Sequence, residues 1–419
     1  MIDKCRALKY TKSIGLYFSA SAIPMVLNLA SNPLVAKNMS PVDYAITGYY
    51  GSFNTLITPL ILFYMMNYYI KSYYQLDEPD RIILKANIFK ALIYVSGFIS
   101  VLCCAGLIGY MKFFNAGSEI PVSPYLYLSV FALPLTGIYT LVLCDYRISR
   151  QSRKYFNLSV VNGVIAIAVI LLLVVILKGG ATGRLLATLL TNAIFFIWSC
   201  WYYRDLFSIR FDFSEFRKIV KFCAPLTLAA MLGFFSNGFD RILLEKTGDV
   251  SELGYYVVGV QMAGYLTVFS TALSATFQPD IYESIARRNY MTTLKYGALL
   301  VGGVIVCVAF FILLAPWLIK ILTAGRYMLS LSYTRIIALS AVTSTLYYAI
   351  SQFTMGIGKT MLTLVNKVIS SVLIVAMFVF LIKSHGFVGA AWGIVLSFLI
   401  QFLCNAVLLY VCRKMSADA

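Results

Sequence analysis

The sequence has little charge for its length. Only 12% of its 419 residues are Asp, Glu, Lys or Arg, whereas a soluble domain carries about a quarter charged residues. Hydrophobic residues make up 60% of the chain, and the mean hydropathy is +0.83. Such a chain has too few polar side chains to cover a surface that faces water. This excludes a soluble globular enzyme and makes lipid the solvent for most of the chain.

Histidine is almost absent, and the cysteines are not grouped. The single histidine is His385, and none of the nine cysteines forms a Cys/His group with the spacing of metal ligands. No cysteine falls in a predicted outward loop, so we expect no disulfide, no metal site and no cofactor. Long polar connections are missing too, the longest being residues 204–218. No connection has room for a domain outside the membrane.

Long apolar runs dominate what is present. They are continuous over about twenty residues, as in residues 160–177, whereas strands of a membrane barrel alternate apolar and polar residues. Backbone groups in lipid must be satisfied within the segment, which favours helices. We therefore predict an all-α polytopic membrane protein with about twelve spans. The predicted spans are residues 11–37, 44–70, 86–110, 123–146, 155–178, 183–203, 219–245, 252–281, 295–322, 329–355, 361–383 and 388–412.

Basic residues exceed acidic ones by 17, and they alternate between the two sides of the predicted spans. Of the 34 Lys and Arg residues, 24 fall on the side that holds the two termini. Cytoplasmic loops carry the excess of Lys and Arg, so we expect both termini in the cytoplasm and an even number of spans. No basic arm or basic patch interleaved with aromatics is present, so we expect contact with membrane lipids and no nucleic acid.

The two halves of the chain resemble each other at an offset of about 206 residues. Lys37 stands six residues before Asp43, and Lys246 stands six residues before Glu252, each acid opening a predicted span. This repetition predicts two six-helix lobes, residues 1–207 and 208–419, related by an axis along the membrane normal. The alternative is shared helix-start chemistry without common descent.

One connection carries a family motif. Asn237-Gly-Phe-Asp240-Arg241, then Gly248, then Glu252-Leu-Gly-Tyr-Tyr256, resembles the repeat signature of the Wzx-type O-antigen and capsular polysaccharide flippases. These belong to the multidrug/oligosaccharidyl-lipid/polysaccharide (MOP) exporter superfamily. The first half of the chain carries a degenerate copy at Asp43-Tyr44-Ala45.

The resemblance implies a MATE-like fold, with two six-helix lobes around a central cavity. It also implies a function without a chemical step: moving an oligosaccharide on undecaprenyl pyrophosphate from the cytoplasmic to the periplasmic leaflet of a bacterial inner membrane by alternating access. The cargo would be an O-antigen or capsule repeat unit. Other polysaccharide-assembly proteins are further candidate partners.

A sugar pyrophosphate headgroup needs a polar, cationic path through about 30 Å of hydrocarbon. Charged residues within spans are costly and are therefore candidates for function. Arg241 could bind phosphate or an acidic sugar through its guanidinium, or it could pair with Asp240 or another helix. Lys367 and Arg335 are the other candidates, and the alternative for each is snorkelling to the membrane interface.

Amides and acids complete the candidate site. Asn28, Asn32 and Asn237 could bond sugar hydroxyls, or equally could bond between helices. Asp240 and Asp280 are candidates for ion coupling, although an acid near the membrane surface, as Asp280 is, can simply be solvated.

Two prolines that open the two halves are candidate hinges. Pro24 and Pro225 each interrupt helical hydrogen bonding within a span. Proline is also common in membrane helices that do not bend in function.

Two other functions remain open. A cation-coupled drug or metabolite antiporter of the same superfamily shares the architecture. A membrane sugar polymerase or ligase fits less well, because such enzymes present a long outer loop, or histidines or acids near the interface.

Overall fold

The fold is known from a computed structural model, which describes residues 2–115, 117–287, 289–357 and 360–417. Within these ranges the regular secondary structure is helical and contains no strand. All twelve predicted spans lie on helical segments. Nine helical segments of the described chain are long and apolar enough to cross a membrane, and one of them, Met361–Cys412, contains two predicted spans. The prediction of an all-α polytopic membrane protein is confirmed.

The chain folds into two compact units. The first consists of Met1–Asp43 and Leu56–Met231, and the second of Tyr44–Thr55 and Leu232–Ala419. The predicted boundary between residues 207 and 208 remains a prediction.

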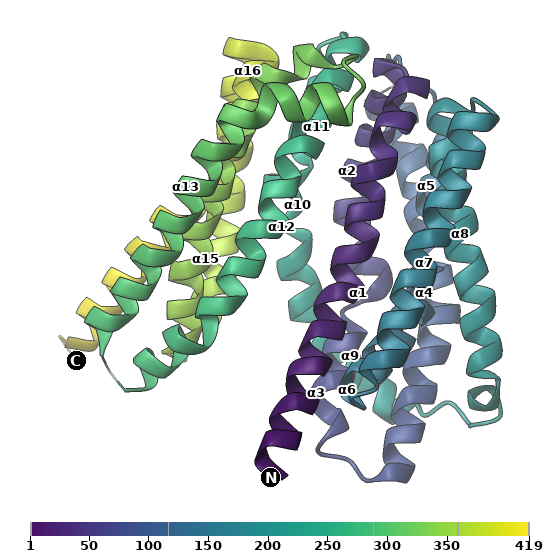
Figure 1. Cartoon of the computed structure of the whole chain (residues 1–419), viewed down its shortest axis with the longest axis vertical. Helices are drawn as coiled ribbons and strands as arrows, with labels where there is room; N and C mark the ends of the chain where they lie inside the picture. Colours follow the sequence, from purple (N-terminus) through teal and green to yellow (C-terminus); the bar gives the residue numbers. More distant parts are fainter. Residues whose placement is uncertain (1, 116, 288, 358–359, 418–419) are drawn as a thin grey trace. The chain divides into compact units, whose positions relative to one another are not determined.

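The first unit is a set of helices that run side by side (Figure 1). Its elements are α1 (Ile2–Asn38), both ends of α2 (Pro41–Leu62), α3 (Met65–Tyr73), α4 (Glu78–Phe114), α5 (Tyr125–Phe131), α6 (Thr136–Ile148), α7 (Ser152–Ile170), the π-helical turns η1 (Leu171–Ile176), α8 (Gly180–Tyr202), the 3-10 turn η2 (Arg204–Phe207) and α9 (Phe213–Met231). Pro24 lies within α1 and packs against α7, where a Cβ added to Gly163 would come within 2.8 Å of the proline Cβ. The small residue therefore allows α1 and α7 to approach closely.

The start of α2 explains why Asp43 stands where it does. Ser40 caps the helix. Its hydroxyl accepts the backbone N–H of Asp43, and the Asp43 carboxylate accepts the backbone N–H of Ser40, which together form a capping box. The second carboxylate oxygen of Asp43 accepts the N–H of Ala181 at 2.8 Å, at the start of α8. Gly180 has φ +51°, and a Cβ there would lie 2.5 Å from Asp43 Oδ1, so this turn requires glycine. One acid thus caps its own helix and ties down another.

A polar cluster closes the core of the first unit at one end. The Asp145 carboxylate on α6 accepts hydrogen bonds from Lys85 Nζ at 2.8 Å, Tyr69 Oη at 2.8 Å and Tyr203 Oη at 2.9 Å. These partners come from α4, α3 and just after the end of α8. A single carboxylate therefore joins four segments of the helical bundle.

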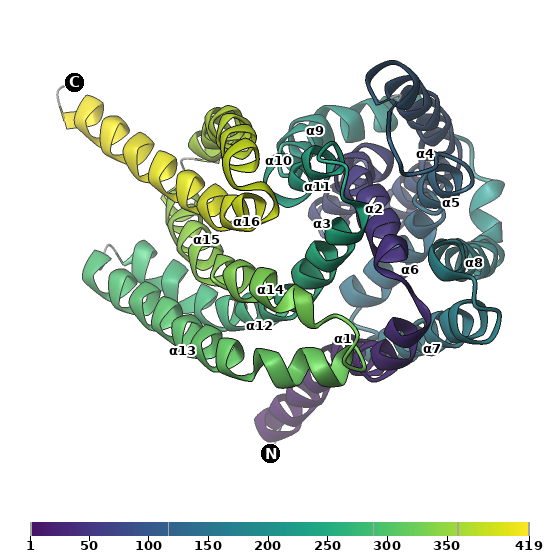
Figure 2. The same ribbon diagram turned by 90° about the horizontal axis from the view of Figure 1, so that it is seen from above.

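The second unit holds the middle of α2 and the remaining helices, several of which lie side by side in Figure 2. They are α10 (Phe234–Asn237), α11 (Phe239–Glu245), α12 (Val250–Ala286), α13 (Tyr290–Leu322), the turn η3 (Met328–Ser330), α14 (Leu331–Ala338), α15 (Ser340–Gly356) and α16 (Thr360–Ala417). Gly386 interrupts α16 with φ 54° and ψ −131°, which are not helical angles. This break divides α16 into the two predicted spans 361–383 and 388–412.

Candidate functional site

The best candidate site of the second unit centres on Lys367, in the first half of α16. Its Nζ donates a hydrogen bond to Gln401 Oε1 at 2.7 Å and lies 4.9 Å from the centroid of the Tyr347 ring. Gln401 belongs to the second half of α16, beyond the break at Gly386. The break lets two parts of one long helix contact each other through their polar side chains.

Gln401 extends this contact to a third segment. Its Nε2 donates to Ser236 Oγ on α10 at 2.8 Å, and its backbone carbonyl accepts from Asn366 Nδ2 at 3.2 Å. Ser236, Asn366 and Gln401 are buried, with exposed fractions of 3%, 0% and 1%. We call Ser236, Tyr347, Asn366, Lys367 and Gln401 the Lys367 network. Hydrogen bonds between helices in lipid hold them together, so the network fixes where the ammonium group sits.

Lys367 has uncharged partners within the described part of the chain. Among the described residues, no carboxylate lies within 4.0 Å of its Nζ. Its partners are a neutral amide and an aromatic ring, which offer partial charges only. Removing a cation from water costs several kcal/mol unless the charge is paired. An anion that entered this site would relieve that cost, so the geometry suits the binding of a phosphate or carboxylate group.

A second polar feature lies on α11. The Asp240 side chain is only 1% exposed, and its Oδ2 accepts a hydrogen bond from Tyr256 Oη of α12 at 2.6 Å. Its Oδ1 is buried and has no hydrogen-bond partner among the residues that the structure describes. A carboxylate left half-satisfied in a buried setting is costly. Such a group is suited to bind a small cation.

Arg241 does not pair with its neighbour. In the described chain there is no ion pair between Arg241 and Asp240, and Arg241 Nε is buried without a hydrogen-bond partner. The ion pair between Arg241 and Asp240, which was the alternative role predicted for Arg241, is therefore not formed. Arg241 has an unused donor, as a phosphate-binding residue would.

The other predicted residues of the second unit do not belong to the Lys367 network. Asn237 is exposed and donates to Gly233 O of its own chain segment at 2.9 Å. Arg335 on α14 and Asp280 on α12 are also exposed. These three positions are accessible to a headgroup or to water, but the described residues do not form a defined binding site around them.

In the first unit, the two predicted asparagines have different surroundings. Asn28 is exposed, whereas Asn32, one turn further along α1, is 5% exposed. Pro24 lies inside a continuous α1, and Pro225 is an exposed residue inside α9. Sugar contact by the asparagines and hinge motion at the prolines remain predictions.

Sequence reasoning missed Ser236, Tyr256 and Gln401. Gln401 had a usable signal, because it is an amide in the middle of an apolar span. Tyr256 had one too, because it ends the motif at residues 237–256. Ser236 had none, because serine is frequent throughout the spans.

Comparisons with known proteins agree with this architecture. A family model described as "Polysaccharide biosynthesis protein" matches residues 75–330, which is more than half of the chain. A Haemophilus influenzae protein of the Lsg locus is 23% identical over 284 residues, 65% of this chain and 67% of that protein.

Solved structures show the same fold at low sequence identity. The lipid II flippase MurJ, in an inward closed conformation, aligns with TM-score 0.72 and 15% identity over 96% of this chain and 87% of that one. A multidrug resistance MATE family transporter of the MOP superfamily, in an inward-facing conformation, aligns with TM-score 0.67 and 16% identity over 95% of this chain and 99% of that one. These alignments confirm the predicted MATE-like fold.

Proposed function

Since this chain belongs to the polysaccharide biosynthesis protein family, we propose that it is a flippase for a lipid-linked oligosaccharide. The cargo would be an O-antigen or capsule repeat unit on undecaprenyl pyrophosphate. The protein would carry it by alternating access from the cytoplasmic to the periplasmic leaflet of a bacterial inner membrane. Both termini would lie in the cytoplasm.

The observation that carries this proposal is the uncompensated cation in the Lys367 network. The pyrophosphate of the cargo is its most polar part and the hardest to move through hydrocarbon. Lys367 offers a positive charge held in place by Gln401 and Tyr347. An ammonium acts as a point charge toward phosphate and tolerates different phosphate geometries. Such tolerance suits a carrier that must also release its cargo.

Flipping needs polar contacts and conformational change, but no bond is broken. Arg241 would add a donor to the phosphates, and Arg335 would add an exposed cation. Asn28, Asn32 and Asn237 would contact sugar hydroxyls. Pro24 and Pro225 would act as hinges.

A cation-coupled antiporter of a drug or metabolite is the second candidate. The buried carboxylate of Asp240, with one oxygen free, favours it, because that oxygen can bind the coupling ion. A flippase can use the same coupling, so the cargo must be tested directly.

The deciding experiment deletes the gene and asks on which face of the inner membrane the lipid-linked oligosaccharide collects. Accumulation on the cytoplasmic face, with loss of surface polysaccharide, is the expected result. Restoration by the plasmid-borne gene is the control. Normal surface polysaccharide, with altered sensitivity to drugs or metabolites, would reject the flippase in favour of the antiporter.

A further inference from the structure

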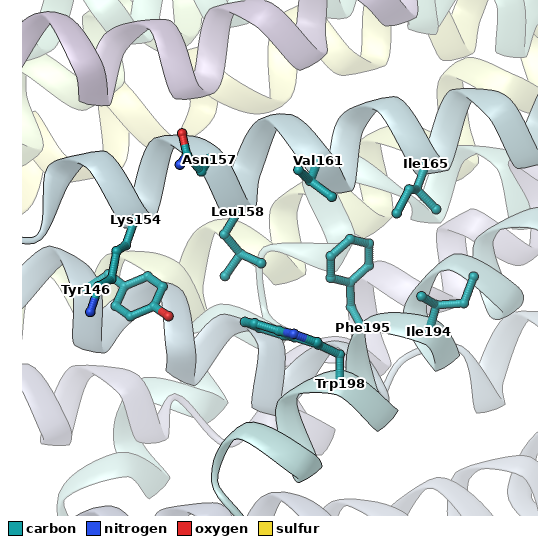
Figure 3. Close-up of a pocket in the computed structure, with 9 residues that line it drawn as sticks. All are labelled: Tyr146, Lys154, Asn157, Leu158, Val161, Ile165, Ile194, Phe195 and Trp198. Carbon is teal, nitrogen blue, oxygen red and sulfur yellow. The ribbon is translucent and has the colours of Figure 1, made fainter.

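A groove in the first unit has a polar end and an apolar body. It encloses about 400 Å³ and is lined by the end of α6 and by facing side chains of α7 and α8 (Figure 3). None of the residues considered for cargo binding lines it. It therefore calls for a separate explanation.

Lys154, Asn157 and Tyr146 line the polar end of the groove. Lys154 Nζ lies 5.8 Å from the centroid of the Tyr146 ring. Within the described ranges, Lys154 has no carboxylate at ion-pair distance. Trp198, also in the groove wall, stacks on Tyr202 with ring centroids 5.4 Å apart. Lysine, tyrosine and tryptophan together are typical of the level of the lipid headgroups.

The body of the groove is apolar and open to lipid. Val161 and Ile165 of α7 face Ile194 and Phe195 of α8 (Figure 3). Val161 and Ile194 remain 49% and 45% exposed. In the most apolar window of Ser152–Ile176, only 11% of the residues are buried within the protein. A hydrocarbon chain can therefore enter the groove sideways from the bilayer.

We propose that this groove binds one anionic phospholipid of the cytoplasmic leaflet. One acyl chain lies between α7 and α8, and the phosphate lies beside Lys154. The volume falls at the lower end of the range of small-molecule sites, about 300–1,000 Å³, which suits one chain segment.

Charge selects the headgroup. Arg147, Arg150 and Arg153 precede Lys154 on the chain, so the polar end lies in a strongly basic stretch. The ammonium of a zwitterionic headgroup would be repelled there, whereas a headgroup with net negative charge would be attracted. The proposal goes beyond the flippase proposal and shares with it only the orientation that places Lys154 on the cytoplasmic side.

The test uses Trp198 as a reporter inside the groove. The chain has four tryptophans, so replacing Trp201, Trp317 and Trp392 with Phe leaves Trp198 alone. The full-length protein is placed in phosphatidylcholine vesicles that contain a fixed fraction of brominated phosphatidylglycerol or brominated phosphatidylcholine. Bromine on the acyl chain quenches a nearby tryptophan. We expect phosphatidylglycerol to associate about fivefold more strongly, the factor that one basic residue near an anionic surface contributes.

Two pairs of variants locate the effect. Lys154→Gln should remove the preference for phosphatidylglycerol, whereas Arg153→Gln, an exposed neighbour that does not line the groove, should retain most of it. Val161→Phe should fill the groove and reduce quenching by both lipids. Val164→Phe, at a position 50% exposed on α7 and outside the groove, should leave quenching unchanged.

Two results would overturn the proposal. Equal quenching by both lipids in the protein with Lys154 intact would mean that Trp198 meets bulk lipid only. Displacement of brominated phosphatidylglycerol by undecaprenyl phosphate, at a far lower fraction than by unlabelled phosphatidylglycerol, would assign the groove to polyprenyl lipid. Both results come from the protein with an unmodified groove, so folding defects of the variants do not affect them.

Discussion

The Lys85 ammonium lies 2.8 Å from the Asp145 carboxylate, and their side chains are only 21% and 15% exposed. Tyr69 and Tyr203 donate to the same carboxylate. The charges are therefore largely removed from solvent and satisfy each other. This contrasts with Lys367, whose partners are neutral. The Lys85–Asp145 pair stabilises the helical bundle, whereas the charge of Lys367 can still bind an anion.

Asp145→Asn should lower the thermal stability of the purified protein. The variant leaves the Lys85 ammonium without an anion, and losing a hydrogen bond to a charged group costs about 1.5–3 kcal/mol. Melting in detergent micelles, followed by size-exclusion chromatography, measures the effect. Asp205→Asn is the matched control, because Asp205 meets Arg204 at 3.9 Å with both side chains exposed. Equal melting temperatures for Asp145→Asn and wild type would contradict the structural role of the cluster.

Lys367→Met should abolish surface polysaccharide while the protein still inserts in the membrane. Methionine keeps the length and removes the charge that the proposed pyrophosphate contact requires. Lys367→Arg should retain part of the export, because a cation remains. Lys383→Met is the control, since Lys383 is exposed on the same half of α16. Export and membrane abundance are compared for all three variants, and full export by Lys367→Met would remove this residue from the site.

Asp240→Asn should reduce the dependence of transport on a proton or sodium gradient. The amide cannot release a proton, and it binds a cation more weakly than a carboxylate does. Transport into proteoliposomes, with and without an imposed gradient, measures this dependence. Asp280→Asn, at an exposed position, should behave like wild type. If gradient dependence persists in Asp240→Asn and is lost in Asp280→Asn, the coupling site lies on α12 instead.

Gly48→Ala should destabilise the second unit. A Cβ at position 48 would lie 2.3 Å from Val257 Cγ2, and valine has few rotamers with which to move aside. Overpacking of this kind costs about 1–3 kcal/mol, and Val257→Ala should restore the melting temperature. Gly51→Ala is the control, because nothing lies within 4 Å of its added Cβ in the same helix. Equal effects at the two glycines would indicate a loss of helix flexibility, with no role for close packing.

The orientation in the membrane can be tested with reporter fusions. Fusions at Ser118 and Ser384 should report the periplasm, and a fusion at Ser208 should report the cytoplasm. These expected locations follow from the excess of Lys and Arg on the side of the membrane that holds the termini. Alkaline phosphatase and a fluorescent protein give opposite readouts at each position. A fusion that reports the opposite side of the membrane at any one of these positions would contradict the predicted alternation of the twelve spans.

The sequence by itself determined the class of fold, and its predicted spans all lie on helical segments of the structure. The thickness of the bilayer sets how long an apolar run must be, and the backbone must form its hydrogen bonds within that run. Both conditions are local, so composition and length are enough to recognise them. The motif at residues 237–256 was also local, and the resemblance drawn from it agrees with the polysaccharide biosynthesis family model and with the MATE-like fold.

Only the tertiary structure decided which polar side chains meet. Lys367 was recognisable as a charge within a span, but its contact with Gln401 depends on the break at Gly386 and on the packing of the two halves of α16. Ser236 joins this network while its neighbour Asn237 is exposed. In water, the apolar stripe of a helix reveals which side is buried. In lipid both the lipid-facing and the helix-facing sides are apolar, so the sequence carries no such stripe, and only packing selects which polar residues converge.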